Sequence, residues 1–225
     1  FLALIVAVLL ITLGGMGFSV VLDIVRHRRF RALTLHSRVV LIMSGLLFLS
    51  GALLIGLVEW ANPLTLGRAD LNPAEKVLAA SFQSVTLRTA GFDTIGQGNL
   101  TPAGQMISII YMFIGASPAS TGGGIKTTTF FVLMQQVRSI FSKRRLGAFH
   151  RRLPDGSLSK AATIMLMGLM VVGCGTFALC VLEPQLDFGR LLFEQISAYS
   201  TAGLSTGITA ELCPASRVVL ILTMF

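Results

Sequence analysis

Two identical tripeptides are the residues of this chain best suited to hold an ion. Thr89-Ala90-Gly91 and Thr201-Ala202-Gly203 each follow a short helical stretch. A cation that enters a membrane must exchange its hydration oxygens for others, and backbone carbonyls supply such oxygens without fixed charge. Glycine tolerates the positive φ that lets successive carbonyls point the same way. We therefore predict that both tripeptides form filter turns. The alternative is a pair of tight turns without ion contact.

The surroundings of the two tripeptides also match. In each case a helix of spanning length comes first, a short helix follows it, and another apolar stretch comes after the tripeptide. Superposing Gly91 on Gly203 aligns further identical residues, namely Gln83 with Gln195 and Thr94 with Thr206. The sequence therefore predicts two copies of a unit made of helix, pore loop and helix.

The short helix of the first copy is predicted within "NPAEKVLAASFQSVTLRTAGFDT". Asn72 is suited to cap it, Pro73 to occupy its first turn and Glu75 to reach back to the cap. It should end near Leu87, which is too short a helix to cross a bilayer. Irregular backbone at membrane depth is tolerated only where it is buried or lines a watery cavity. The negative end of the helix dipole would then favour cations at the turn.

A third motif is "SPASTGGGIKTTT" at 117–129, in a segment that should otherwise be helical. Pro118 removes a backbone donor, and each glycine lowers helix preference by about 1 kcal/mol. Hydroxyl side chains can satisfy the freed backbone groups. We predict a helix interrupted over 115–126 by a loop that changes shape easily, with these candidate gate residues: Gly115, Ser117, Pro118, Ser120, Thr121, Gly122, Gly123, Gly124 and Lys126. A static kink is the alternative.

Two basic side chains fall at membrane depth in this interpretation. Lys126 is costly in lipid by roughly 2.5–3.5 kcal/mol, so it should face the water path or a partner, where it would repel a passing cation. The alternative is that it extends toward the cytoplasm. Arg88 lies beside the first turn and should point away from it, paired with Asp93 or Glu75.

The composition explains why these motifs are assigned to a membrane. The chain is 53% hydrophobic and 12% charged, with a mean hydropathy of +0.79. Uncharged stretches near the ~20 residues needed for a span occur at 1–22, 39–58, 103–125 and 161–182. The first is too long for a signal peptide and lacks its flanking features. We expect an all-α polytopic membrane protein, and an internal fragment of it, because the chain starts at Phe1 and stops inside an apolar run.

The basic residues indicate topology. Twelve of the 18 lysines and arginines lie in linkers 26–38 and 138–160, whereas connections 59–75 and 183–194 are mainly acidic. The positive-inside rule places the basic linkers in the cytoplasm. The net charge of +8 therefore needs no nucleic-acid partner. These linkers could contact an acidic partner or lie solvated near lipid headgroups. The three cysteines have no metal-site spacing and are expected to be small buried hydrophobes.

With RTAGF at 88–92, GASPASTGGGIKTTT at 115–129 and STAGLSTG at 200–207, the chain resembles the Trk/Ktr/HKT superfamily of potassium transporters, and within it the bacterial Trk-type or Ktr-type membrane subunit. The resemblance implies four units of helix, pore loop and helix around one pore, of which this chain holds the end of the second, the third and most of the fourth. It implies K⁺ bound at Thr89, Gly91, Thr201 and Gly203, and a gate at 115–126.

The resemblance also sets expected boundaries and partners. Residues 1–25 would be the closing helix of the preceding unit, 26–38 a cytoplasmic linker, 39–143 a unit with a broken second helix, 144–160 a second cytoplasmic linker, and 161–225 a truncated unit. The protein would lie in the cytoplasmic membrane as a homodimer, with lipid around it and a cytoplasmic nucleotide-binding regulatory subunit. No cofactor is expected in this chain.

Two other classes of function were weighed. An intramembrane hydrolase would need a base near its serine nucleophile, but all three histidines, His27, His36 and His150, lie in the basic linkers, far from Ser117 or Ser120. We therefore expect no enzyme. A secondary transporter of another small solute could also use a broken helix, but its usual inverted repeats conflict with two units of the same orientation.

Overall fold

The computed structural model describes residues 2–142, 147–148, 151–152 and 156–225. The other positions of the predicted linker 144–160 lie outside the described residues. The helices are α1 (Leu2–Gly15), α2 (Phe18–His27), α3 (Leu35–Glu59), α4 (Pro73–Thr86), α5 (Pro102–Phe113), α6 (Thr127–Ser142), α7 (Ser157–Leu182), α8 (Phe188–Tyr199) and α9 (Pro214–Met224). Short elements complete the fold: η1 (Phe30–Ala32), η2 (Gln97–Asn99), η3 (Ile208–Ala210), β1 (Gly147–Ala148) and β2 (Arg151–Arg152).

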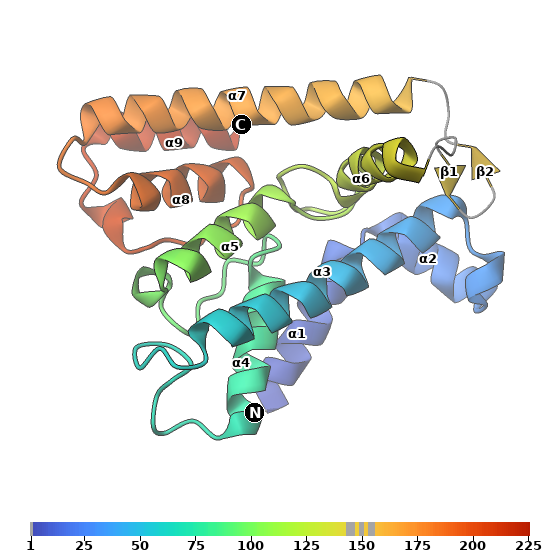
Figure 1. Cartoon of the computed structure of the whole chain (residues 1–225), viewed down its shortest axis with the longest axis horizontal. Helices are drawn as coiled ribbons and strands as arrows, with labels where there is room; N and C mark the ends of the chain where they lie inside the picture. The colour runs from blue at the N-terminus through green and yellow to red at the C-terminus, as the bar shows by residue number, and fades with distance from the viewer. Residues whose placement is uncertain (1, 143–146, 149–150, 153–155) are drawn as a thin grey trace.

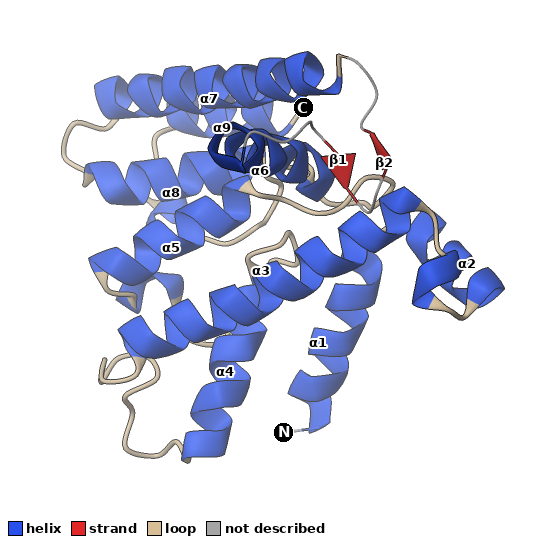
Figure 2. Ribbon diagram, turned by 45° about the vertical axis from the view of Figure 1, so that its right-hand side comes forward, coloured by secondary structure: helices blue, strands red, loops and turns tan. Residues whose placement is uncertain are grey.

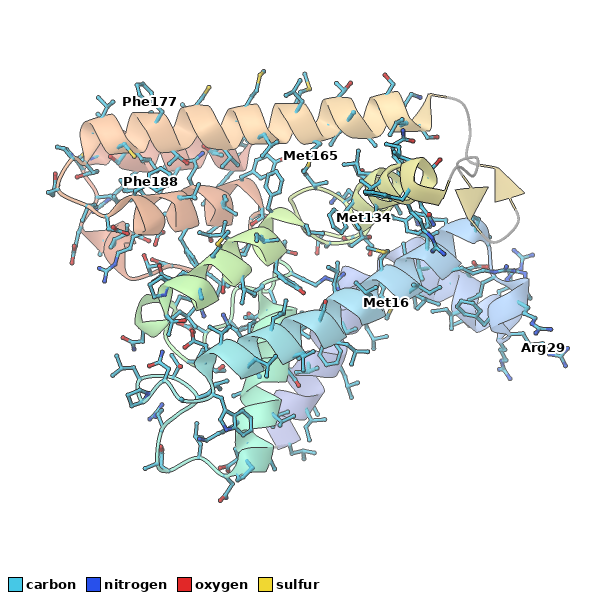
Figure 3. The ribbon with its side chains drawn as sticks, in the orientation of Figure 1. Met16, Arg29, Met134, Met165, Phe177 and Phe188 are labelled. Carbon is cyan, nitrogen blue, oxygen red and sulfur yellow. The ribbon has the colours of Figure 1, made fainter. Side chains whose placement is uncertain are left out.

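The fold is helical, as expected, and within the part of the chain that the structure describes two single helices are long and apolar enough to cross a membrane. These are α3 and α7. Many of their large apolar side chains are exposed, and Phe177, which is 72% exposed, projects outward from α7 (Figure 3). Met165 instead faces the apolar space between α7 and helices α5 and α6. An exposed apolar surface of this kind suits contact with lipid.

The helices form two units that repeat in space. Figure 1 shows α3 and α7 running in the same direction, away from the end of the molecule that carries α2 and the β1–β2 pair. In each unit the long helix packs on the short one, α3 on α4 and α7 on α8. The closing helix of one unit lies against the short helix of the next, because α1 packs on α4 and α5 packs on α8 (Figure 2). This order is what rotation of one unit about an axis would produce.

In each unit the long helix is joined to the other two helices by the same two residue types, a glycine and a glutamate. A glycine in the long helix lets the short helix approach: a Cβ on Gly51 would lie 2.3 Å from Ser84 Oγ, and one on Gly175 would lie 2.0 Å from Gln195 Nε2. A glutamate at the end of the same helix then caps the closing helix. Glu59 accepts from the backbone N–H of Thr101 at 2.9 Å, and Glu183 accepts from that of Cys213 at 2.6 Å. We did not predict this carboxylate cap from the sequence.

The predicted start and end of α4 are confirmed. Pro73 begins the helix, the Asn72 N–H donates to Glu75 Oε2 at 2.9 Å, and the helix ends at Thr86 with Leu87 as its cap. Most of its last turns are buried, so the irregular backbone after it begins inside the protein. The condition for non-helical chain at membrane depth is therefore met here.

The uncharged stretch 1–22, within the closing helix expected over 1–25, is not one continuous helix. The chain bends by 97° between α1 and α2. Gly17, at the bend, has a φ of 83°, and a Cβ there would lie 2.4 Å from the carbonyl oxygen of Pro118. Apolar composition alone did not reveal the break, because the residue that requires it is distant in the sequence.

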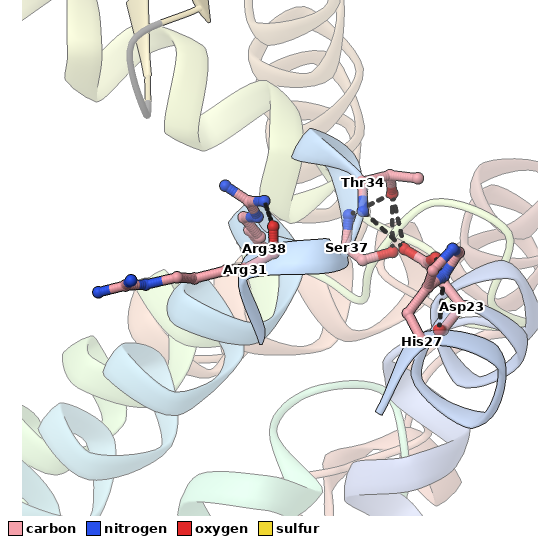
Figure 4. A network of polar contacts seen from close by, with 6 residues as sticks. All are labelled: Asp23, His27, Arg31, Thr34, Ser37 and Arg38. Carbon is pink, nitrogen blue, oxygen red and sulfur yellow. Dashed lines mark hydrogen bonds and ion pairs between the residues drawn. The ribbon is translucent and has the colours of Figure 1, made fainter. Parts of the chain in front are cut away.

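After the bend, α2 is tied to the start of α3 by one carboxylate. Asp23 accepts from His27 Nδ1 at 2.8 Å, from the Thr34 N–H at 2.9 Å and from Thr34 Oγ1 at 2.8 Å (Figure 4). Thr34 in turn caps α3 through the Ser37 N–H. The first basic linker is therefore a short, hydrogen-bonded corner, and Arg29 projects from it into solvent (Figure 3).

The cap at Glu183 predicts a pH effect on stability. Hydrogen bonds, first of all from the Cys213 backbone, lower the pKa of this carboxyl, which directly follows α7. A lowered folded-state pKa stabilises the fold above the ordinary glutamate value of about 4.3, and this contribution is lost as the pH falls through the folded-state pKa. The full-length protein should melt at a higher temperature than Glu183→Gln at pH 7, and the difference should shrink below about pH 4. Melting curves in detergent at both pH values measure this, and an unchanged difference would contradict it.

Candidate functional site

The two Thr-Ala-Gly turns meet at the ends of α4 and α8. A Cβ on Gly91 would lie 2.6 Å from the Ala202 carbonyl oxygen, and one on Gly203 would lie 3.7 Å from Gly91 Cα. Both glycines have positive φ, 76° at Gly91 and 77° at Gly203. The structure thus brings the two predicted turns side by side, with the backbone conformation that glycine allows.

The backbone of the threonine in each turn also adopts the left-handed conformation, which we did not predict from the sequence. Thr89 has a φ of 70° and Thr201 a φ of 53°. A residue with a Cβ pays roughly 1–2 kcal/mol for this conformation, so the surroundings must hold it in place. Positive φ on either side of Ala90 and Ala202 gives the two turns the same unusual alternation.

The carbonyl groups of the turns are unpaired. Within the described part of the chain, no hydrogen bond reaches the carbonyl oxygens of residues 89–91 or 201–203. In each unit a hydroxyl of the short helix holds the carbonyl of the residue that directly follows the turn. Thr86 Oγ1 donates to Phe92 O and Ser197 Oγ to Leu204 O, both at 2.6 Å. Buried backbone carbonyls are nearly always satisfied. The unpaired carbonyl oxygens of these braced turns are therefore available to coordinate a cation.

Exposure alternates along the second turn. Thr201 and Gly203 are exposed, whereas Ala202 and Leu204 are only 2% and 3% exposed. Extended chain places successive residues on opposite sides. One side of this turn is therefore anchored in the protein, and the other faces open space.

The predicted interruption at 115–126 is present, since α5 ends at Phe113 and α6 begins at Thr127. The loop lies directly against both turns. A Cβ on Gly122 would lie 2.1 Å from Thr89 Oγ1, and one on Gly123 would lie 2.6 Å from the Ser200 carbonyl oxygen. The Gly123 N–H also donates to Thr201 Oγ1 at 3.1 Å. The glycines are thus needed for close approach as well as for breaking the helix.

Hydrogen bonds close the base of this loop. The Ile125 N–H donates to Phe113 O at 3.0 Å, and Thr127 Oγ1 donates to Ser117 Oγ at 3.1 Å. Ser120 Oγ donates to Ser117 O at 2.5 Å, so hydroxyls satisfy backbone groups as predicted. Lys126 directs its ammonium group at the Gly122 carbonyl oxygen within the loop. Lys126 therefore links the end of the loop to its middle.

The bend between α1 and α2 holds the other side of the loop. The Ser117 N–H donates to Gly15 O at 3.1 Å, and the Phe18 N–H donates to Ala119 O at 3.2 Å. Ala119 has a positive φ of 60°. We call residues 15–18 and 117–119 the latch. It joins the loop to the bend between α1 and α2, and we did not predict it from the sequence.

The predicted ion-pair partner of a side chain near the site is wrong. Arg88 pairs with neither Asp93 nor Glu75. Its guanidinium donates to Ser44 Oγ at 3.2 Å and lies 3.5 Å from Ser44 O, on α3. Both carboxylates are occupied elsewhere, Asp93 by backbone N–H groups of its own loop and Glu75 by the cap of α4.

The cysteines also differ from expectation. Cys174 is exposed, Cys180 is half-buried, and Cys213 caps α9. All three are free thiols. Within the described residues, no group of three or more histidine, cysteine or acidic side chains could hold a metal ion.

Re-entrant helices that present paired glycine turns, within repeated units of helix, pore loop and helix, define a polytopic membrane transport protein. The chain belongs to the family described as TrkH, cation transport protein, which matches residues 1–225. Membership in this family also confirms that the chain is not an enzyme.

Several known proteins are similar to the chain. It is 37% identical over 223 residues to Ktr system potassium uptake protein B of Bacillus subtilis, covering 99% of this chain and 49% of that protein. It is 34% identical over 229 residues to potassium/sodium uptake protein NtpJ of Enterococcus hirae, covering 100% and 50%. The fold matches the crystal structure of the potassium transporter TrkH from Vibrio parahaemolyticus with a TM-score of 0.76 at 18% identity, covering 98% and 48%. The chain thus spans about half the length of the relatives it matches.

The latch predicts an effect of one methyl group. Gly17→Ala should push Pro118 away and loosen the loop, because the added Cβ would lie 2.4 Å from a carbonyl oxygen at a φ of 83°. In the full-length protein the maximal rate of cation uptake should rise, about tenfold for each 1.4 kcal/mol by which the loop is released. Gly14→Ala is the control, since nothing lies within 4 Å of its added Cβ. Equal uptake by the two variants would show that the latch does not hold the loop.

Proposed function

We propose that the protein containing this chain takes up potassium across the cytoplasmic membrane, through a pore whose filter includes residues 89–91 and 201–203. The observation that carries the proposal is the pair of adjacent turns with unpaired carbonyl oxygens. Such oxygens can replace the hydration shell of a cation without fixed charge. The names of the relatives, which describe potassium uptake and potassium/sodium uptake, support this choice of ion.

In this proposal K⁺ contacts Thr89, Gly91, Thr201 and Gly203. The short helices α4 and α8 end at the two turns, so their negative dipole ends favour a cation there. Each turn has one glycine, whereas the TVGYG filter of potassium channels has two. Fewer ordered carbonyl layers should give fewer ion sites and weaker discrimination between potassium and sodium. The rest of the filter would come from the half of the protein outside this chain.

The loop at 115–126 is the proposed gate. It touches Thr89 and Thr201 and is fastened by Lys126 and by the latch. A loop in this position obstructs an ion that leaves the filter. Releasing a few hydrogen bonds would let it move, since its glycines impose little conformational preference.

The domain boundaries and partners predicted from the resemblance become part of this proposal. The two basic linkers would face the cytoplasm by the positive-inside rule. In accord with this, α2, which leads into the first linker, and the β1–β2 pair within the second lie at the same end of the molecule (Figure 1). The linkers would contact a nucleotide-binding regulatory subunit, and the protein would act as a homodimer in lipid. No nucleic acid is involved. Rubidium uptake by the full-length protein, measured beside uptake of an amino acid, tests the function, and amino acid uptake without rubidium uptake would overturn it.

The filter proposal predicts the effect of Gly203→Ser. A side chain at a φ of 77° is strained by roughly 1–2 kcal/mol, so the turn should distort. The apparent affinity for potassium should fall by about tenfold, and selectivity over sodium should weaken. Gly45→Ser is the control, because its added Cβ meets nothing within 4 Å and its φ is not positive. Uptake kinetics of Gly203→Ser equal to those of the control would count against ion binding at this turn.

The gate proposal predicts that Lys126→Ala raises potassium flux. The change removes both the positive charge and the bond to the Gly122 carbonyl. The maximal uptake rate should therefore rise while the apparent affinity stays the same. Lys160→Ala, at an exposed lysine of α7, is the matched control. If flux from normal amounts of Lys126→Ala is unchanged or lower, the loop has a structural role only.

A further inference from the structure

A buried carboxylate stands behind the second turn. Glu194, on α8, is only 4% exposed. Its Oε1 accepts from Ser205 Oγ at 2.7 Å, from the Thr206 N–H at 2.9 Å and from Thr206 Oγ1 at 3.1 Å, and its Oε2 accepts from Thr209 Oγ1 at 2.8 Å. These donors all lie in the segment that follows the Thr-Ala-Gly turn, up to and including η3. One side chain thus fixes the path of the chain as it leaves the turn.

No cation accompanies this carboxylate. Among the described residues the ion pairs are His27 with Asp23 and Arg68 with Asp70, and neither involves Glu194. A buried charge normally has an ionic partner or enough hydrogen bonds to replace water. Glu194 has the hydrogen bonds, so its negative charge is held in place but not neutralised.

The first unit also has a carboxylate close to its turn, but at a different position. In the register that aligns Gly91 with Gly203, the position of Glu194 is taken by Phe82, which is 2% exposed. The position of Ser205 is taken by Asp93. Asp93 accepts from the Gly96 N–H at 3.0 Å and from Gln97 Nε2 at 2.8 Å.

Gln97 then completes the link to the short helix. Its Oε1 accepts from Gln83 Nε2 at 2.6 Å, and its Nε2 donates to Gln83 Oε1 at 3.1 Å. The segment after the first turn is therefore joined to its short helix by the Gln97–Gln83 amide pair, and Asp93 holds Gln97 in place. The acid lies on the short helix in the second unit and on the segment after the turn in the first.

We propose that Glu194 and Asp93 are positioning residues for ion selection, one for each turn. The carboxylate lies on the short helix in one unit and on the segment after the turn in the other, so each turn keeps one carboxylate beside it. This inference rests on the proposed function. Each carboxylate restrains the segment that follows its turn through hydrogen bonds and thereby fixes the turn. Its negative charge also lowers the energy of a cation nearby. The requirement is for a carboxylate near the turn, and the repeat shows two positions that supply it.

The test uses the full-length protein and rubidium uptake competed by potassium and sodium. Glu194→Gln keeps the size of the side chain and removes its charge. The apparent affinity should fall by about tenfold, as expected for loss of charged hydrogen bonds, and potassium should compete less well against sodium. The maximal rate should change much less. Glu211→Gln, at an exposed glutamate after η3, is the control and should behave as the parent.

A second variant separates positioning from general destabilisation. Ser205→Asp in the Glu194→Gln background places the acid where the first unit has Asp93, and it should restore at least part of the affinity and selectivity. The shift in melting temperature caused by potassium over sodium provides a readout besides uptake. It should shrink in Glu194→Gln and recover in the double variant.

The possible outcomes are distinct. Reduced affinity with rescue by Ser205→Asp supports the proposal. Unchanged affinity and selectivity in Glu194→Gln overturn it, and so does a loss that the relocated acid fails to restore while the protein still folds and melts as the parent does. If the parent itself takes up no potassium, the proposed function fails first, and the melting shift then shows whether the turns bind the ion at all.

Discussion

The structure depends on a constraint that the membrane places on the backbone: main-chain groups at membrane depth need a partner. Irregular segments of this chain find such partners in hydroxyls, carboxylates and neighbouring backbone. The carbonyls of the two Thr-Ala-Gly turns receive no hydrogen bond from the described residues. Thr86 and Ser197 hold the carbonyl that directly follows each turn, so the chain is braced where it leaves the turn. An ion that exchanges water for the oxygens of the turns would complete what the fold leaves unsatisfied.

Glycine has two separate effects around this site. At Gly91 and Gly203 it allows positive φ. At Gly122 and Gly123 it allows the loop to approach the turns so closely that any Cβ would collide with Thr89 or Ser200. The first effect shapes the two turns of the proposed filter, and the second lets the loop pack against them. The two are coupled, because the loop touches the same threonines whose left-handed backbone defines the turns.

The two units share an architecture while differing in detail. Gly51 with Glu59 and Gly175 with Glu183 repeat the same packing and capping at the same spacing. The carboxylates beside the turns do not repeat by position, since Asp93 lies in the loop after its turn and Glu194 on the helix before its turn. Packing of helix on helix permits few geometries, so its residues recur. A charge can be supplied from either side of a turn, so its position can change while its effect remains.

The sequence by itself determined the membrane class, the two tripeptides, the capped start of α4 and the interruption at 115–126. Each of these depends on local chemistry: apolar length, the conformational freedom of glycine, the missing donor of proline and the reach of a side chain over one helical turn. Only the tertiary structure decided the bend at Gly17, the contact of Arg88 with Ser44, the latch and the hydrogen bonds of Glu194. These depend on which distant residue lies opposite, and no local pattern carries that information.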